Sequence, residues 1–512
     1  MIEDDRLAAG GSPRRHSGRS VPRDEEDWVW IEEESLDIFS GSVIRIHIPA
    51  YRVVIRTEAN RMKNSDLNRI DKQICGSVWT SDHIQCLRDQ ICNDIGPRPT
   101  GSKSYREALE IIASALRRAG ATKVRAETIP VFGWDHGPSE LRLTSPRRRV
   151  FNSVQHVHTT SADVSGPLVN VPVVSERELD LHARKIDGAV VLASGPGFEP
   201  AKHYPLSLRV RDIAKRGAIG VVTYNAQPAM GPSQHHLGVD DDVPIPAVGV
   251  SNDDGLELVN LTSRSKPKVK ISVSGRSRKT KCANLVGEVA PSRRTNEDIV
   301  LNAHLDCLPI TPGALDNLSG VLTLVEIVRA LAPHRSKFRR RLRLLIPTGE
   351  EYGLVGSAQY VKQHHDELDD ICFDFSLDTL CPGTSRGIAV MWAPEMRDMI
   401  ERTMRGTGRH CKVQNLYCAG SDYLPFMMSG IAAARAADWE NSLPRWCHTT
   451  MDNAHNLPVE WIQLNAMPFA QLLLRLLTEP RPLPTKRKSR DQVAALMAAE
   501  GEERYMKFLN VW

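Results

Sequence analysis

The fold is set by Ile299-Val300-Leu301-Asn302-Ala303-His304-Leu305-Asp306, a short apolar run that ends in a histidine and an aspartate. Two later apolar runs, Leu342 to Ile346 and Cys372 to Leu377, are followed in the same way by Glu350-Glu351 and by Asp378. Short runs of this kind are typical of buried strands. Because open α/β sheets bind ligands at the carboxyl ends of their strands, we expect these polar side chains to meet at one edge of a sheet.

A helix is predicted between the first two of these strands. From Asn317 to Ala332 the apolar residues recur at helical spacing, at Val321, Leu324, Val325, Val328 and Leu331. This places Asp316 at the start of the helix, close to the end of the first strand. Strands that alternate with helices indicate an α/β fold, and we expect a mixed sheet flanked by helices.

The polar residues at these strand ends, together with His448 further along the chain, suit a pair of metal ions. A two-metal site needs a carboxylate that bridges ions roughly 3.5 to 4 Å apart, further ligands, and a water exposed to substrate. Imidazole and carboxylate ligands suit zinc, and the lack of paired cysteine ligands argues against a closed structural site. Taken singly, each residue is more often structural, but their ordered recurrence predicts metal-assisted hydrolysis.

Five further motifs extend this pattern, namely Gly96 to Ser102, Pro312 to Gly320, Gly349 to Ser357, Gly420 to Asp422 and His448 to Asp452. In this order they resemble the motifs of the dizinc aminopeptidases of the bacterial leucyl aminopeptidase and aminopeptidase Y type. The resemblance runs from near Ser77 to near Pro480. It implies the zinc exopeptidase fold and an enzyme that removes the amino-terminal residue of a peptide substrate.

The resemblance also implies a role for each site residue. Two zinc ions per chain would be held by His304 and Asp378 for one ion, by Glu351 and His448 for the other, and by Asp316 as the bridge. Glu350 would be the general base toward the water shared by the two ions. Asp306, two positions after His304, is well placed to orient that imidazole through a hydrogen bond.

Two alternatives to an aminopeptidase stay open. A dizinc carboxypeptidase of the same fold would need a basic group for the substrate carboxylate, and Arg435 and Arg445 are candidates. A non-catalytic binding relative would have lost ligands, whereas every expected ligand and the base are present here. The aminopeptidase is favoured because Leu315 to Gly320 resembles that branch more closely, and because Glu350, Asp378 and Asp422 are candidates for a negative pocket that would bind a free amine.

Three positions depart from the family pattern without removing a ligand. Cys307 stands where a serine is common, Cys447 where a tyrosine is often found, and His455 where an acid is usual. If that tyrosine helps the oxyanion in relatives, its replacement puts the rate in doubt but not the reaction. The thiols of Cys307, Cys381 and Cys447 are expected to be small buried hydrophobes.

The catalytic domain is expected to span residues 76–136 and 276–480, with an insert at 137–275. The apolar runs of the insert at 189–192, 217–222 and 243–248 predict strands, with a helix through Val210 to Lys215. This interval resembles the protease-associated domain that many such peptidases carry. Its His235-His236 and Asp240-Asp241-Asp242 are expected in a solvated loop, so the insert should cap the cleft without supplying chemistry.

The two ends of the chain carry no functional motif. Residues 1–75 form an amino-terminal extension in which Val43 to Arg56 alternates as one or two strands would. Residues 481–512 contain the basic Lys486-Arg487-Lys488, predicted to be a solvated linker, and one amphipathic helix from Asp491 to Leu509.

Composition argues against several classes of function. A net charge of +4, from 66 basic and 62 acidic residues, supports neither nucleic-acid nor membrane binding. No apolar run approaches the roughly 18 to 20 residues of a transmembrane span. The acidic start, Met1-Ile2-Glu3-Asp4-Asp5, is unlike a signal peptide and favours a cytoplasmic location, with secretion as the alternative. The ten cysteines lack repeated spacing, so free thiols are expected, although Cys411 and Cys418 could pair in an oxidising compartment. The pattern does not indicate an oligomeric state.

Overall fold

The computed structural model describes residues 44–48, 51–55, 62–171, 175–194, 204–225, 227–292, 295, 297–380, 386–407, 411–417, 420–438 and 446–512. The chain divides into two compact units, Met1–Arg61 and Met62–Trp512. The first contains an antiparallel hairpin of β1 (Ile44–Ile48) and β2 (Tyr51–Ile55), in the stretch whose alternation predicts one or two strands.

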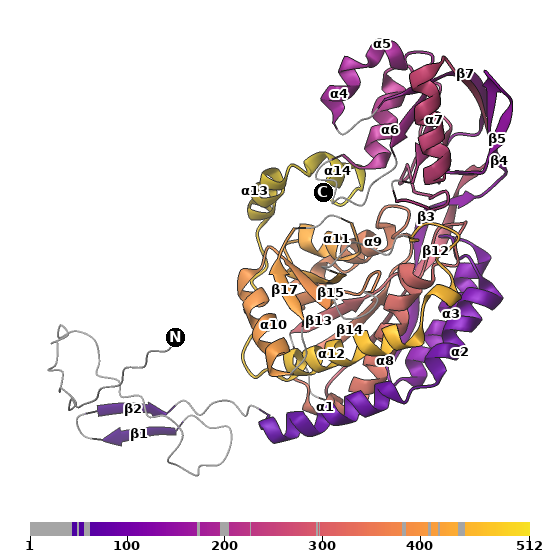
Figure 1. Cartoon of the computed structure of the whole chain (residues 1–512). Helices are drawn as coiled ribbons and strands as arrows, with labels where there is room; N and C mark the ends of the chain where they lie inside the picture. The colour runs from indigo at the N-terminus through magenta and orange to yellow at the C-terminus, as the bar shows by residue number, and fades with distance from the viewer. Residues whose placement is uncertain are drawn as a thin grey trace, which may run out of the picture. The chain divides into compact units, whose positions relative to one another are not determined.

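An eight-stranded mixed sheet forms the centre of the second unit (Figure 1). Its strands are β3 (Thr122–Asp135), β12 (Arg276–Val289), β13 (Asp298–Asn302), β14 (Arg341–Ile346), β15 (Ile371–Ser376), β16 (Arg386–Met391), β17 (Lys412–Asn415) and β18 (Ala433–Asp438). They lie in the order β17-β16-β18-β15-β13-β14-β12-β3. The four strands β18, β15, β13 and β14 run parallel to one another. At the two ends of this group, β16 pairs antiparallel with β18, and β12 pairs antiparallel with β14. The expected mixed α/β fold is confirmed.

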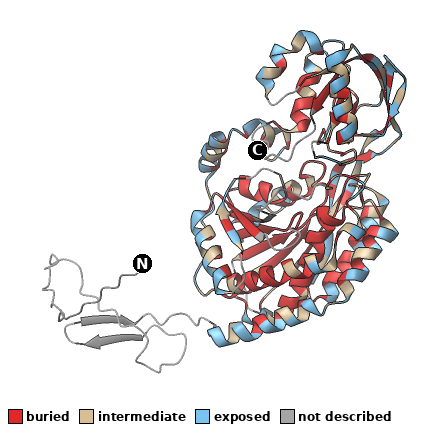
Figure 2. Cartoon of the chain, viewed as in Figure 1, coloured by how far each residue is buried: buried red, intermediate tan, exposed pale blue. Residues whose placement is uncertain are grey.

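Helices cover both faces of this sheet, and its central strands are buried (Figure 2). One face carries α1 (Asn64–Trp79), α2 (His83–Asp89), α3 (Lys103–Arg118), α8 (Ser319–Leu331), α10 (Pro394–Gly406) and α12 (Val459–Thr478), and the other α9 (Val355–Gln363) and α11 (Tyr423–Met428). On β13, Ile299 and Leu301 pack on the face that carries α8 and α12. Val300 packs on the opposite face with residues of α9 and α11. Burial on both faces explains why this run is continuously apolar. Among the described residues, no helix is long and apolar enough to cross a membrane.

Helix α1 belongs to the second unit and not to an amino-terminal extension. It contacts α8 and α12, and Asp71 pairs with Arg475 of α12 at 2.6 Å. The boundary between the two units falls between Arg61 and Met62, so the boundary expected at residue 75 is placed too late.

The interval between β3 and β12 builds a second eight-stranded sheet, although β3 and β12 pair with each other. Its elements are β4 (Ser139–Ser145), β5 (Arg149–Phe151), β6 (Ser153–Gln155), β7 (Ala162–Asn170), α4 (Glu176–Leu181), α5 (Ala183–Ile186), β8 (Val190–Ser194), α6 (Leu206–Lys215), β9 (Gly220–Tyr224), β10 (Ala247–Val250), α7 (Asn252–Arg264) and β11 (Lys268–Val273). Val191 and Val221 pack in a core with α4, α5 and α6, whereas Val190 and Val222 pack in a core with α7. This layered segment is therefore inserted into the domain built on the first sheet.

The carboxy-terminal tail forms two helices, α13 (Arg490–Glu500) and α14 (Glu503–Phe508). The single helix predicted from Asp491 to Leu509 is wrong, because Gly501 adopts a left-handed conformation with φ 74° and ends the first helix. Arg504 of α14 contacts the buried carboxylate of Asp212 on α6 at 2.6 and 2.7 Å. The tail is thereby tied to the insert.

Candidate metal centre

The predicted ligands meet at the carboxyl ends of the parallel strands. His304 follows β13, Glu351 lies in the turn after β14, and Asp378 follows β15. Asp316 lies just ahead of α8 with non-helical φ and ψ, so the helix begins at Ser319, slightly later than expected. His448 comes from a turn that precedes α12 and has a positive φ of 62°.

These side chains form two overlapping groups. The ligand atoms of His304, Asp316 and Asp378 lie within 4.8 Å of one another, and so do those of Asp316, Glu351 and His448. Asp316 belongs to both groups, and each of its oxygens faces a different one. Oδ1 lies 3.3 Å from Nε2 of His304, and Oδ2 lies 3.1 Å from Nε2 of His448. This is the geometry of a bridging carboxylate.

The spacing within each group fits a small tetrahedral ion. Ligand atoms about 2.1 Å from such an ion lie roughly 3.4 Å apart. His304 Nε2 lies 3.6 Å from Asp378 Oδ1, and His448 Nε2 lies 3.3 Å from Glu351 Oε2. Both distances are compatible with a shared ion.

Several side-chain atoms of the two groups have no hydrogen-bond partner among the described residues. His304 Nε2, Glu351 Oε1 and Asp378 Oδ1 are buried and accept or donate no hydrogen bond within the described part of the chain. Buried polar atoms in folded proteins are nearly always paired. A divalent cation in each group would satisfy these atoms, so the residues fit a two-metal site.

The electrostatics of the site also favour cations. Burial acts to lower the pKa of His304, but surrounding carboxylates, first Glu350 and then Asp316, raise it well above its usual value. Burial raises the pKa of Glu350 and of Glu351 well above the usual value for a glutamate. Burial acts in the same direction on Asp316, but His304 and His448 outweigh it and hold that pKa below its ordinary value. Negative groups gathered away from water are stabilised by bound positive charge.

Glu350 borders the site without joining either ligand group. Its Oε2 lies 3.7 Å from Nε2 of His304, and it lines a cavity of about 160 Å³ together with Asp316, Glu351, Asp378 and His448. A carboxylate with a raised pKa beside the metal positions suits proton transfer at neutral pH.

Asp306 contacts His304 in a way that differs in detail from the expected one. Nδ1 of His304 lies 3.1 Å from the backbone carbonyl oxygen of Asp306 and 3.8 Å from its carboxylate. The carboxylate accepts hydrogen bonds from the hydroxyl of Thr100 and from the backbone N–H groups of Glu350 and Glu351. Asp306 thus supports the imidazole and the glutamate turn at once.

Two residues that support the site had no role assigned from the sequence. The carboxylate of Asp452 accepts hydrogen bonds from the N–H groups of Leu315 and Asp316. The fully buried Arg98 donates to the carbonyl oxygens of Leu305 and Gly313, at 3.0 Å each. Arg98 lies in the motif from Gly96 to Ser102, and Asp452 in the motif from His448 to Asp452. Their place in these motifs is the feature of the sequence that could have indicated a role at the site.

The insert reaches the site, so the prediction of a solvated loop at His235-His236 is wrong. His236 lines the cavity, and Nδ1 of His235 lies 3.2 Å from Nδ1 of His448. The loop is held beside Val157, which forms a β-bridge with His236, and so faces the turn that carries His448. The tail contributes Tyr505 to the same cavity. These contacts join segments far apart in sequence.

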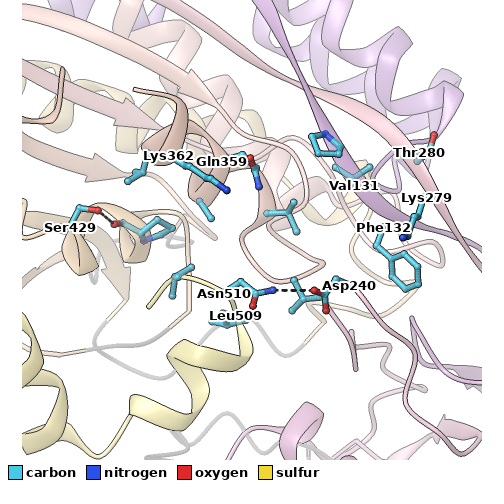
Figure 3. Close-up of a pocket in the computed structure, with 17 residues that line it drawn as sticks. Val131, Phe132, Asp240, Lys279, Thr280, Gln359, Lys362, Ser429, Leu509 and Asn510 are labelled. Carbon is cyan, nitrogen blue, oxygen red and sulfur yellow. Dashed lines mark hydrogen bonds between the residues drawn. The ribbon is translucent and has the colours of Figure 1, made fainter. Parts of the chain in front are cut away.

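Figure 3 shows a larger cavity, of about 620 Å³, with Leu509 among its lining residues. Leu509 also lines the smaller cavity at the predicted metal ligands. The larger cavity lies among β3, β12, α9, the insert at Asp240 and the tail at Asn510, whose amide donates to the Asp240 carboxylate. Within the described residues, no group of metal-binding side chains falls in it.

The cysteines near the site are buried. Burial raises the pKa of Cys307 and raises that of Cys447 well above the usual value, which disfavours the reactive thiolate. Cys381 and Cys418 lie outside the described residues, as does Arg445, so the possible pairing of Cys411 with Cys418 stays a prediction.

Comparison with known proteins identifies both parts of the second unit. Residues 284–473 match Peptidase family M28, and residues 164–258 match the PA domain. Carboxypeptidase Q of Xenopus laevis is 24% identical over 430 residues, which cover 81% of this chain and 89% of that protein. Aminopeptidase YwaD of Bacillus subtilis (strain 168) is 26% identical over 431 residues, which cover 81% of this chain and 87% of that protein.

Among solved structures, BSAP, a zinc aminopeptidase from Bacillus subtilis, matches with a TM-score of 0.60 at 22% identity. The match covers 79% of this chain and 98% of that one, and it shows a shared fold. The PA segment lies between β3 and β12, and the M28 segment begins within β12. Residues 284–473 therefore carry the match to peptidase family M28, and the match to the PA domain lies in a segment inserted between the paired strands β3 and β12.

Proposed function

We propose that this protein is a zinc-dependent exopeptidase that binds two zinc ions per chain. The observation that carries the proposal is the position of the Asp316 carboxylate between two histidines. Its Oδ1 faces His304, and its Oδ2 faces His448. His304 and Asp378 would hold one ion, and Glu351 and His448 the other. Imidazole and carboxylate ligands suit zinc, and BSAP, which shares the fold, is named a zinc aminopeptidase.

The side chains then divide the work of hydrolysis. Bound zinc would polarise the scissile carbonyl and lower the pKa of a water. Glu350 takes the proton of the attacking water and passes it to the leaving amine. Asp306 keeps Glu350 in place through the backbone N–H of that residue. Asp452 holds the backbone of Asp316 in the same way.

The size of the metal cavity favours removal of single residues. Its volume of about 160 Å³ is smaller than the roughly 300 to 1,000 Å³ of sites for drug-sized ligands. His236 of the insert and Tyr505 of the tail form part of its wall. A cavity closed in this way accepts one end of a chain more readily than its middle.

We propose that the amino terminus is the end that enters. Glu350 and Asp378 line the cavity and offer negative charge to a free ammonium group. A carboxypeptidase is the second candidate, because Arg435 of β18 also lines the cavity and could bind a terminal carboxylate. Both activities occur in the names of the relatives, YwaD and carboxypeptidase Q.

Three peptides of one sequence test the proposal: one with free ends, one acetylated at the amino terminus and one amidated at the carboxyl terminus. An aminopeptidase cleaves the free and amidated peptides and spares the acetylated one. A carboxypeptidase spares the amidated peptide, and Arg435→Met should then lower its kcat/KM by about 10- to 100-fold, because a hydrogen bond to a charged group is lost. Equal cleavage of all three peptides would contradict exopeptidase activity of either kind.

A further inference from the structure

The turn that carries His448 is held by a loop of the insert. The backbone N–H of Gln234 donates to the carbonyl oxygen of His448 at 3.0 Å. On the next residue, Nδ1 of His235 lies 3.2 Å from Nδ1 of His448, and the two rings meet edge to face with centroids 5.0 Å apart. A backbone contact and a side-chain contact therefore link the same two segments.

The positions of the hydrogens follow from the position of His448. Its Nε2 faces Asp316 and Glu351, so Nε2 is the nitrogen that would bind a metal ion. A neutral imidazole that binds through Nε2 carries its proton on Nδ1 and donates it there. Nδ1 of His235 must then accept, which leaves the His235 proton on Nε2. Oγ of Ser233 lies 3.3 Å from that nitrogen and can accept it.

The loop that presents His235 is fixed by the insert itself. The backbone N–H of His235 donates to Nδ1 of His156, and Nε2 of His156 lies 2.8 Å from the hydroxyl of Thr223 on β9. The carbonyl oxygen of His235 accepts from the N–H of Val157 at 2.9 Å. The position of His235 is therefore fixed by hydrogen bonds within the insert.

We propose that His235 is a positioning residue for His448, so that the PA domain contributes the outer hydrogen bond of one metal ligand. This rests on the proposed function, because it requires His448 to bind zinc. Metal-binding histidines commonly donate their second N–H to a carboxylate, a carbonyl or water, and loss of that partner typically weakens metal binding by about 10- to 100-fold. Here the partner is an imidazole that belongs to a separate domain.

The test compares zinc affinity in full-length variants. His235→Leu removes the acceptor, and His235→Asn keeps an oxygen near the position of Nδ1. His182→Leu is the control, because His182 lies between α4 and α5 of the insert and lines neither cavity. Zinc bound per chain is measured against a graded zinc-buffered chelator series. The melting temperature of each chelated protein reports folding.

We expect His235→Leu to weaken one of two zinc sites by about 10- to 100-fold. His235→Asn should recover most of that affinity, and His182→Leu should retain zinc as the wild type does. The proposal is overturned if His235→Leu binds both ions normally, or if His235→Asn is as impaired as His235→Leu while both are folded. His448→Ala in the same series tests the ligand itself. Normal zinc binding by that variant would refute the metal site and not merely its outer contact.

Discussion

Asp452 accepts a hydrogen bond from the backbone N–H of Asp316 at 3.0 Å, and its other oxygen accepts one from Leu315 at 2.6 Å. The expected bridging ligand is thus held through its backbone by a buried acid on another segment. Asp452→Ala should weaken zinc binding by about 10- to 100-fold, because the loop around Asp316 loses both acceptors. Zinc content after dialysis against chelator measures this. The exposed neighbour Met451 offers a matched control, and Met451→Ala should behave as the wild type.

Glu350→Gln should separate proton transfer from metal binding. The substitution keeps the size of the side chain and removes the base, so turnover should fall by about 100- to 10,000-fold while zinc content stays near two per chain. Glu351→Gln should instead lower zinc content, because that carboxylate belongs to a ligand group. Turnover is measured with an amino-acyl chromogenic substrate. Unchanged turnover in Glu350→Gln would refute its role as base.

The strand-end residues of the site could be predicted because each lies a few positions from its own apolar run. His304 and Asp378 each stand just past a buried strand, and parallel strands bring such ends together. Sequence order also placed Asp316 correctly ahead of α8, although the helix starts later than its apolar period suggests.

The remaining contacts could not be predicted because they join segments distant in sequence. His236 and Tyr505 reach the cavity from the insert and the tail, and no local period indicates which way either segment faces. The break at Gly501 was missed for a different reason. Apolar residues recur on both sides of it, and only the left-handed φ of the glycine divides the helix.

The stability of the catalytic domain should depend on pH through His364 and Glu127. Nε2 of His364, at the end of α9, lies 3.0 Å from Oε2 of Glu127 on β3. The hydrogen bond to Glu127 raises the pKa of His364. Burial acts to raise the pKa of Glu127, but His364, together with Arg125, outweighs it and lowers that pKa overall. The charged pair therefore stabilises the fold at mildly acidic pH.

The sign follows from the raised histidine pKa. The contribution is fully present below the unfolded value of about 6.5 and is lost as pH rises through the raised pKa. His364→Gln should lower the melting temperature at about pH 5.5 and have little effect at about pH 9. The expected loss in the free energy of unfolding at the lower pH is up to about 1 kcal/mol. His365→Gln, at an exposed neighbouring position, should show no such difference. An equal effect of His364→Gln at both pH values would contradict the pair.

Leu509 should limit the length of substrate that the site accepts. It lines both the metal cavity and the larger cavity, and it is buried against Gly353 in the turn that carries Glu351. Leu509→Ala should connect the two cavities and raise kcat/KM for a tetrapeptide relative to a dipeptide by about tenfold, which corresponds to about 1.4 kcal/mol. The same change should destabilise the fold by about 2 to 3 kcal/mol, because it leaves a void. Leu509→Met, which keeps most of the volume, should preserve the wild-type preference. If a folded Leu509→Ala protein keeps the wild-type ratio of rates, the wall at Leu509 does not set substrate length.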